Sequence, residues 1–129
     1  MRGDHVLPVL RGLAAVGQNG LVQIPTVTVS EIPADAYLLD VREDDEWEAG
    51  HAPGAAHLPM MEIPVRMAEV PQDGKVVVVC RVGGRSGQVV AYLRQQGWDN
   101  VINLDGGMLG WAAAGRPVIA DNGRAPHIA

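Results

Sequence analysis

The run of four valines from Val76 to Val79 constrains the fold of this chain more than any other stretch. It shows no alternation of polar and apolar residues, which is typical of a parallel strand in the middle of a sheet with both faces covered. Cys80, the only cysteine among 129 residues, follows the run directly. Because open parallel sheets carry their sites at the carboxyl ends of the strands, we expect this thiol at the functional edge of the sheet.

A short loop and a helix follow the cysteine. Gly83 and Gly84 allow the backbone to reach positive φ, so that successive N–H groups can turn toward one point. Ser86 is a natural N-cap, and the apolar stripe after it predicts a helix that stops at Gly97. The sequence therefore predicts a strand, a loop and a helix, with the thiol held above the helix N-terminus.

This loop has the features of a binding site for a negatively charged sulfur. Orphan amides and the helix dipole stabilise an anion, and such a setting lowers a thiol pKa from about 8.5 to about 3.5–7.5. Arg81 and Arg85 add positive charge nearby. We expect Cys80 to be the catalytic residue, with its thiol open to solvent. The candidate anion-binding loop consists of Arg81, Val82, Gly83, Gly84, Arg85 and Ser86.

Further short strands and helices alternate along the rest of the chain. Besides the valine run, strands are predicted over 26–30, 36–41, 55–58 and 101–104. Helices are predicted after the second strand, from Pro64, and after Asp105 as an N-cap. The alternation predicts an α/β domain with a mostly parallel central sheet of about five strands and helices on both faces.

Composition places the chain among globular proteins, because 47% of the residues are hydrophobic and 19% are charged. The net charge of -5 argues against a nucleic-acid surface. No apolar run approaches the roughly 20 residues that span a bilayer, and no signal-peptide pattern opens the chain, so we expect a cytoplasmic location. The predicted organisation is an irregular N-terminal extension over 1–25, one domain over 26–119 and a mobile C-terminal tail over 120–129.

Two polar features have a structural interpretation. The run 43–48 contains five acidic residues and predicts a short helix with a solvated acidic face. Nothing near it supplies the spacing of metal ligands, so we expect no metal site there. His51 and His57 could each act as a general base, but a free histidine is more often a hydrogen-bonded packing residue.

Three segments resemble the signatures of one known family. The loop from Cys80 to Arg85 has the pattern C-x-x-G-x-R of the rhodanese-like sulfurtransferases. LLDVREDDEWEAGHAPGAAHLP, over 38–59, resembles the first signature of that family, and NLDGGMLGWAAAGRPV, over 103–118, resembles its closing one. The resemblance covers about 27–118 and implies a rhodanese-like domain. Asp40 and Arg42 match the Asp-x-Arg element, for which we expect a supporting structural role.

The resemblance implies sulfur transfer through a persulfide on Cys80. The thiolate would take a sulfane sulfur from a small anionic donor such as thiosulfate and pass it to cyanide, a thiol or a protein acceptor. Arg85, and secondarily Arg81, would attract the donor. No general base and no cofactor are expected, and neither nucleic acid nor membrane is expected as a partner.

Three alternatives remain open from the sequence. Phosphatases with the pattern C-x(5)-R use a similar loop, but here Ser86 stands where their arginine would. The family also contains non-catalytic binding or regulatory modules, which often lose the cysteine that this chain retains. Finally, a free cysteine is commonly just a small buried hydrophobic residue.

Overall fold

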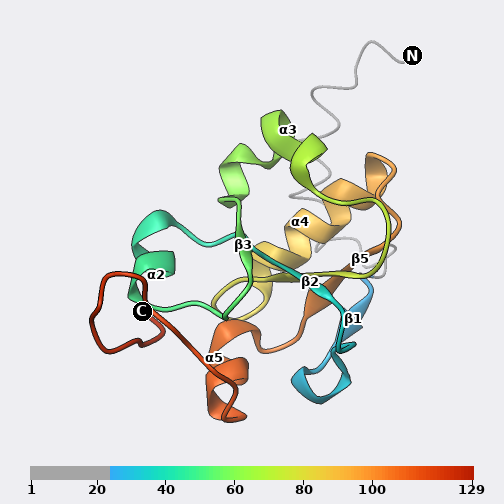
Figure 1. Cartoon of the computed structure of the whole chain (residues 1–129). Coiled ribbons are helices and arrows are strands. Elements are labelled where there is room, and N and C mark those ends of the chain that lie inside the picture. The colour runs from blue at the N-terminus through green and yellow to red at the C-terminus, as the bar shows by residue number, and fades with distance from the viewer. Residues whose placement is uncertain (1–23) are drawn as a thin grey trace.

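The computed structural model describes residues 24–129. The irregular extension predicted over 1–25 lies outside the described residues, except for Ile24 and Pro25. The described part forms a single sheet with helices packed around it, and the chain ends beside α2 (Figure 1). α2 is the helix Asp44–Ala49.

Five parallel strands form the sheet, in the order β1-β5-β4-β2-β3. They are β1 Thr26–Val27, β2 Tyr37–Asp40, β3 Ala56–His57, β4 Val76–Val79 and β5 Val101–Leu104. The valine strand β4 occupies the central position, between β2 and β5. The predicted parallel sheet of about five strands is therefore confirmed, although β1 is shorter than expected.

The valines of β4 pack on both faces of the sheet. Val76 and Val78 pack into one hydrophobic cluster, and Val77 and Val79 pack into the other. All four side chains are at most 1% exposed. Two buried faces explain why this strand contains no polar position, because side chains alternate between the faces of a strand.

Helices cover both faces, as predicted. The helices besides α2 are α3 Ile63–Arg66, α4 Gly84–Gln95 and α5 Gly107–Ala113, with 3₁₀ turns over Val29–Glu31, Met60–Glu62 and Met67–Glu69. Side chains of α3 and α4 join the cluster that contains Val78, whereas side chains of α5 join the cluster that contains Val77. Among residues 24–129, no helix is long and apolar enough to cross a membrane.

The two predicted N-caps are wrong. The helix α4 is preceded by Gly83, with φ of 114°, and already includes Ser86. The helix α5 is preceded by Gly106, with φ of 82°, rather than by Asp105. In both cases a glycine in the left-handed region turns the chain into the helix, which a residue with a Cβ does only at a cost.

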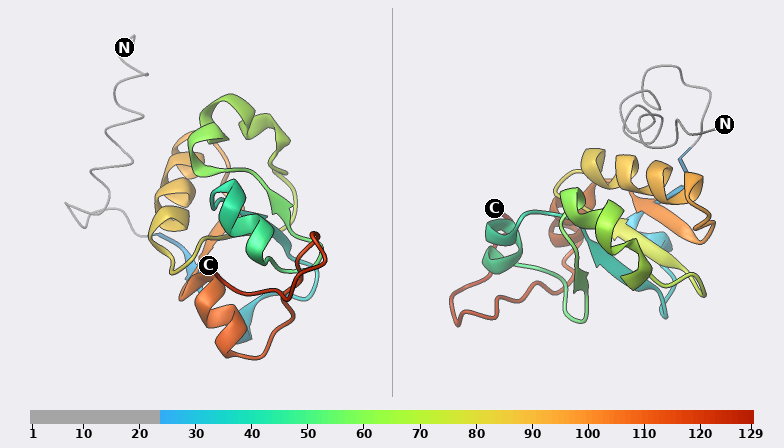
Figure 2. Two further views of the ribbon diagram at one scale, coloured as in Figure 1. Left: turned by 90° about the vertical axis from the view of Figure 1, so that its left-hand side faces the viewer. Right: turned by 90° about the horizontal axis from the view of Figure 1, so that it is seen from above.

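The segment expected to be a mobile tail, over 120–129, lies along α2 (Figure 2). The amide of His127 donates to the carbonyl oxygen of Ala49 at 3.0 Å. Just before the segment, Ile119 forms an antiparallel bridge with His51. Ile128 packs on the hydrophobic cluster beneath α5. These contacts bring the end of the chain to the same side of the molecule as Cys80.

Candidate active site

The thiol of Cys80 lies in a ring of backbone amides at the carboxyl end of β4. The amide of Gly83 donates to Cys80 Sγ at 3.0 Å, and the amides of Val82 and Ser86 also face the sulfur. The positive φ of Gly83 makes this turn possible. The structure therefore brings together the loop residues and the cysteine that the sequence singles out.

The helix α5 holds the other side of the same loop. The amide of Met108 donates to the carbonyl oxygen of Cys80 at 2.8 Å, and the amide of Leu109 donates to that of Arg81 at 3.0 Å. Gly107 lies so close that a Cβ on it would be 2.5 Å from the Cys80 carbonyl oxygen. Because the N–H and C=O of a trans peptide group point in opposite directions, the bond from Leu109 to the Arg81 carbonyl oxygen turns the Val82 amide away from α5 and toward the sulfur.

A chain of buried polar side chains continues from the sulfur. Cys80 Sγ lies 3.2 Å from Ser86 Oγ, and Ser86 Oγ lies 2.5 Å from Asn103 Oδ1. Asn103 Nδ2 donates to the Gly83 carbonyl oxygen at 3.3 Å. Sequence reasoning missed Asn103. The signal for it is an amide side chain in the otherwise apolar strand VINL, since a buried polar group needs a partner.

Two effects of opposite sign act on the pKa of Cys80. Burial raises the pKa of the thiol, because it disfavours the charged form. Hydrogen bonds from the Ser86 hydroxyl and from the amides of Ser86, Gly83 and Val82 lower it, and together they outweigh the burial. The net effect is a lowered pKa, so the surroundings favour a thiolate.

The expectation of a solvent-open thiol is wrong. Cys80 is 1% exposed and belongs to the hydrophobic core cluster that also contains Val78. Solvent contacts the outer side of the loop instead, where Val82 is 57% exposed. Because the amides and the Ser86 hydroxyl close around the sulfur, a reactant reaches it only when the loop moves aside.

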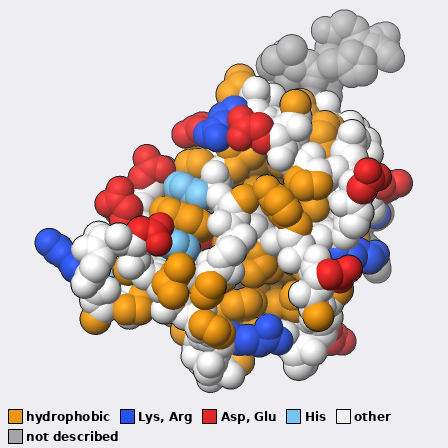
Figure 3. All heavy atoms as spheres, viewed as in Figure 1, with side chains coloured by type: hydrophobic (Ala, Val, Ile, Leu, Met, Phe, Trp, Pro, Cys, Tyr) orange, Lys and Arg blue, Asp and Glu red, His pale blue; other side chains and the backbone are white. Residues whose placement is uncertain are grey.

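The side chain of Arg85 is paired with Glu46 of α2. Two hydrogen bonds of 2.7 and 2.9 Å join the guanidinium to the two carboxylate oxygens. These bonds lower the pKa of Glu46 to about 2, against the effect of burial, and they raise the pKa of Arg85. Glu46 thus corrects the prediction of a wholly solvated acidic face, although neighbouring acidic side chains gather over α2 on the surface (Figure 3).

Arg81, the second arginine of the loop, lies at the surface. Its Nε donates to the backbone oxygen of Ala129 at 3.0 Å. This contact joins the loop to the segment over 120–129. The two loop arginines therefore face different partners, a carboxylate of α2 and the backbone of the C-terminal segment.

Asp40 and Arg42 form a fully buried pair beneath α2. Arg42 donates to both carboxylate oxygens of Asp40, with Nη2 to Oδ2 at 2.8 Å, and Nη2 also donates to the carbonyl oxygen of Gly50 at 2.7 Å. Both side chains are 0% exposed. Through the bond to Gly50 the pair ties the end of β2 to the residue that follows α2, and the hydrogen bonds of these two side chains do not include Cys80.

The two histidines stack on either side of Trp47. The ring centroid of Trp47 lies 3.6 Å from that of His51 and 4.7 Å from that of His57. His51 Nδ1 contacts the Trp47 carbonyl oxygen at 2.8 Å, and His57 Nε2 contacts that of Arg42 at 2.8 Å. These contacts hold α2 on the sheet, and they do not involve the thiol. Within 24–129 no group of three or more His, Cys, Asp or Glu side chains could hold a metal ion.

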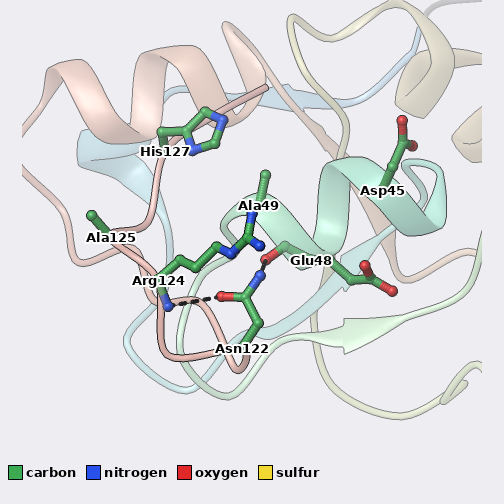
Figure 4. A pocket seen from close by; sticks show the side chains of 7 residues that line it. All are labelled: Asp45, Glu48, Ala49, Asn122, Arg124, Ala125 and His127. Carbon is green, nitrogen blue, oxygen red and sulfur yellow. Dashed lines mark hydrogen bonds between the residues drawn. The ribbon is translucent and has the colours of Figure 1, made fainter.

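A surface hollow of about 240 Å³ lies between α2 and the C-terminal segment (Figure 4). Its lining residues are Asp45, Glu48, Ala49, Asn122, Arg124, Ala125 and His127. None of them belongs to the loop around Cys80. The anion-binding geometry at the thiol therefore comes from the loop itself and not from this hollow.

Comparisons with known proteins show similarity to one family. A family model for the rhodanese-like domain matches residues 28–114. The chain is similar to a sulfurtransferase of Allochromatium vinosum, with 48% identity over 89 residues that cover 69% of this chain and 83% of that protein. Among solved structures, a rhodanese-related protein from Thermoplasma volcanium has a TM-score of 0.70 at 27% identity, covering 75% of this chain and 99% of that one.

A larger protein contains a similar part. The NAD-dependent persulfide reductase of A. fulgidus matches with a TM-score of 0.60 at 33% identity, covering 77% of this chain and 17% of that protein. The family model spans most of the chain, and the relative from Allochromatium vinosum is nearly half identical. The chain therefore belongs to the rhodanese-like domain family.

Proposed function

We propose that this chain is a sulfurtransferase that carries a sulfane sulfur on Cys80 as a persulfide. The observation that carries the proposal is the ring of amides around Cys80 Sγ, with the amide of Gly83 at 3.0 Å. Such a ring stabilises a thiolate before the reaction and an anionic sulfur after it. The similarity to a sulfurtransferase of Allochromatium vinosum supports the same activity.

The first half-reaction loads the cysteine. The Cys80 thiolate attacks the outer sulfur of thiosulfate, the new S–S bond forms, and the old S–S bond breaks with its electron pair leaving on sulfite. The persulfide then carries one negative charge on its outer sulfur, and sulfite carries two, so charge is conserved. No proton is exchanged, because both the nucleophile and the leaving group are anions.

The second half-reaction unloads it. A nucleophile such as cyanide or a thiolate attacks the outer sulfur, and the electron pair of the S–S bond returns to Cys80 Sγ. Cyanide leaves as thiocyanate, whereas a thiolate leaves as its own persulfide. The similarity to part of a persulfide reductase supports a thiol or protein thiol as the acceptor in the cell.

The pairing of Arg85 with Glu46 bears on the donor. A free arginine would attract a dianion such as thiosulfate, but the carboxylate of Glu46 already neutralises much of this charge. Arg81 is exposed at the surface, where its Nε donates to the backbone oxygen of Ala129 rather than to a side-chain carboxylate. We therefore propose thiosulfate as a competent donor whose first contact is Arg81.

A thiocyanate assay tests the proposal. The protein is incubated with thiosulfate and cyanide, and thiocyanate is measured for the natural chain and for Cys80→Ser. We expect production in the natural chain and none above background in the variant, since the variant lacks the sulfur that stores the transferred atom. Intact mass should show one added sulfur atom on the natural chain alone. Equal thiocyanate production by Cys80→Ser contradicts the proposal.

A non-catalytic binding module is the second candidate, and the 1% exposure of Cys80 favours it. The two candidates differ in one observable, the persulfide itself. If intact mass shows no added sulfur after exposure to thiosulfate, polysulfide and a small organic persulfide, the binding module is the better description. An added sulfur that iodoacetamide pretreatment prevents supports the enzyme.

A further inference from the structure

Asn103 is a buried amide in a strand that is otherwise apolar. The residue is 9% exposed, whereas Val101 and Leu104 of the same strand are fully buried. Strand β5 pairs with β1 and β4, so its backbone groups are engaged in the sheet. The polar atoms of the Asn103 side chain point to the loop around Cys80 instead. A buried amide costs stability unless it is bonded, which makes its partners informative.

Chemistry fixes which way the amide points. A carbonyl oxygen can only accept, so the group that faces the Gly83 carbonyl oxygen at 3.3 Å is the Nδ2 donor. Oδ1 then faces Ser86 Oγ at 2.5 Å. Because Oδ1 can only accept as well, the proton between these two oxygens is that of the Ser86 hydroxyl.

Ser86 has a single proton for two acceptors. Its Oγ lies 3.2 Å from Cys80 Sγ and is 0% exposed, so water does not supply a second donor. With a neutral thiol the chain of bonds is complete, because the thiol donates to Ser86 and Ser86 donates to Asn103. With a thiolate, Ser86 can stabilise the sulfur only by turning its proton away from Asn103.

We propose that Asn103 is a positioning residue that holds the proton of the Ser86 hydroxyl and releases it to Cys80 Sγ only when that sulfur carries negative charge. This proposal rests on the proposed sulfur transfer. In the persulfide the charge lies on the outer sulfur, and the neutral Sγ is a poor acceptor, so the Ser86 proton returns to Asn103. When an acceptor thiolate takes the outer sulfur, the electron pair of the S–S bond returns to Sγ, and the proton turns back toward it.

The Ser86 proton therefore stabilises Sγ as the leaving group of the second half-reaction. It also limits how far the resting thiolate is stabilised, because Asn103 competes for the same proton. The thiolate interacts electrostatically with Arg85 of α4, whose guanidinium is bonded to Glu46. Changes at Asn103 leave both of these charges in place.

The test is the pH dependence of Cys80 alkylation by iodoacetamide in Asn103→Leu. Leucine has a similar volume but accepts no hydrogen bond, so the Ser86 proton becomes permanently available to the sulfur. We expect the pKa of Cys80 to fall by about one unit, the scale of one hydrogen bond to a charged group. Above this pKa, loading from thiosulfate should slow about threefold and unloading to a thiol should speed up about threefold, since nucleophilicity and leaving-group ability change in opposite directions.

Ser86→Ala is the control that distinguishes an effect of Asn103 through the Ser86 proton from a merely structural effect of Asn103. Without the hydroxyl there is no proton to compete for, so Asn103→Leu should leave the Cys80 pKa unchanged in that background. An equal fall of the pKa in both backgrounds overturns the proposal, because Asn103 would then act through the Gly83 carbonyl group. An unchanged or raised pKa in Asn103→Leu alone also overturns it.

Asn103→Asp keeps the test decisive if Asn103→Leu does not fold, which thermal unfolding reveals. A carboxylate holds the Ser86 proton more tightly, so the Cys80 pKa should rise, and rise less when Ser86→Ala is added. Equal rises in both backgrounds contradict the proposal. Alkylation requires no sulfur transfer, so a failure of these pKa shifts is distinguishable from a failure of Cys80 to form a persulfide.

Discussion

Arg85 shows how one contact can change the role of a single residue. Its place in the loop suggests an open cation for binding an anionic donor, but its guanidinium is held by both carboxylate oxygens of Glu46. The pair joins the loop to α2, the helix that contains Glu46. Arg85 therefore holds the loop against α2.

Replacing Glu46 by glutamine should lower the stability at neutral pH by about 1 kcal/mol, because the pair is partly exposed and solvent screens it. The pKa of Glu46 is about 2 in the folded protein, below its value of about 4.3 in an unfolded chain. A lowered pKa gives stability that is present above the unfolded value and lost as the pH falls through the folded one. Urea unfolding should therefore separate the two proteins at pH 7 and bring them together near pH 2.

Glu48→Gln is the matched control for this change. Glu48 lies on the same helix and is exposed, so its replacement removes the same charge without breaking the pair. We expect unfolding midpoints within experimental error of the natural chain. A loss in Glu48→Gln as large as that in Glu46→Gln would show that helix charge, and not the bond to Arg85, determines the difference.

The start of α5 holds the loop around Cys80 in place. Its first amides bind the carbonyl oxygens of Cys80 and Arg81, at 2.8 and 3.0 Å. Gly107 makes this approach possible, with φ of 54° and no room for a side chain. Gly107, the first residue of α5, therefore helps to position Cys80, which lies 27 residues earlier in the sequence.

Gly107→Ala should disturb the loop. The new Cβ would lie 2.5 Å from the Cys80 carbonyl oxygen, so α5 or the loop must shift, and the positive φ adds strain. We expect the free energy of unfolding, measured in urea, to fall by about 3 kcal/mol. We also expect the Cys80 pKa to rise, since the loop amides would no longer point at the sulfur. The pKa is measured from the pH dependence of iodoacetamide alkylation.

Gly115→Ala separates strain from collision. Gly115 also has positive φ, of 79°, but nothing lies within 4 Å of the Cβ it would gain. It should cost only about 1 kcal/mol and leave the Cys80 pKa unchanged. Equal losses in the two variants would mean that the contact between Gly107 and the loop does not matter.

Local patterns account for what the sequence predicts well. Four apolar side chains in a row identified β4, because a strand buried on both faces has no polar position. The caps of α4 and α5 are harder to predict, since either a polar residue, here Ser86 or Asp105, or a nearby glycine can precede a helix. The chain used Gly83 and Gly106, which freed the Ser86 side chain to face the sulfur.

The contacts that the sequence does not predict join residues far apart along the chain. Glu46 and Arg85 are 39 residues apart, and Ser86 and Asn103 are 17 apart, so no local pattern connects them. Glu46 also stands in a run of five acidic residues, in which nothing marks it as the one that is paired. Such contacts follow from the sheet order, which places α2, α4 and β5 around one strand end.

At the scale of the whole molecule, the thiol is part of the core. Cys80 packs with residues of β2, β4, α3, α4 and β5 in one cluster, and the loop closes over it. Its 1% exposure means that any reaction at sulfur begins with a local opening, because buried groups react only in such open states. The molecule thus protects the thiol from bulk solvent, and reactants reach it through motion of the loop.

The rate of cysteine modification measures this opening directly, because Cys80 is the only cysteine in the chain. We expect the bulky disulfide reagent DTNB to react with the folded protein at least about tenfold more slowly than with the chain in urea, since it needs a wide opening of the loop. The small reagent iodoacetamide should show a much smaller difference, because a small opening of the loop is enough to admit it. Rates are compared at one pH above the pKa of the unfolded thiol, so that ionisation does not contribute to the ratio. Equal slowing of both reagents would mean that the thiol is released only by unfolding of the whole domain, and no slowing of either would mean that the loop is open in solution.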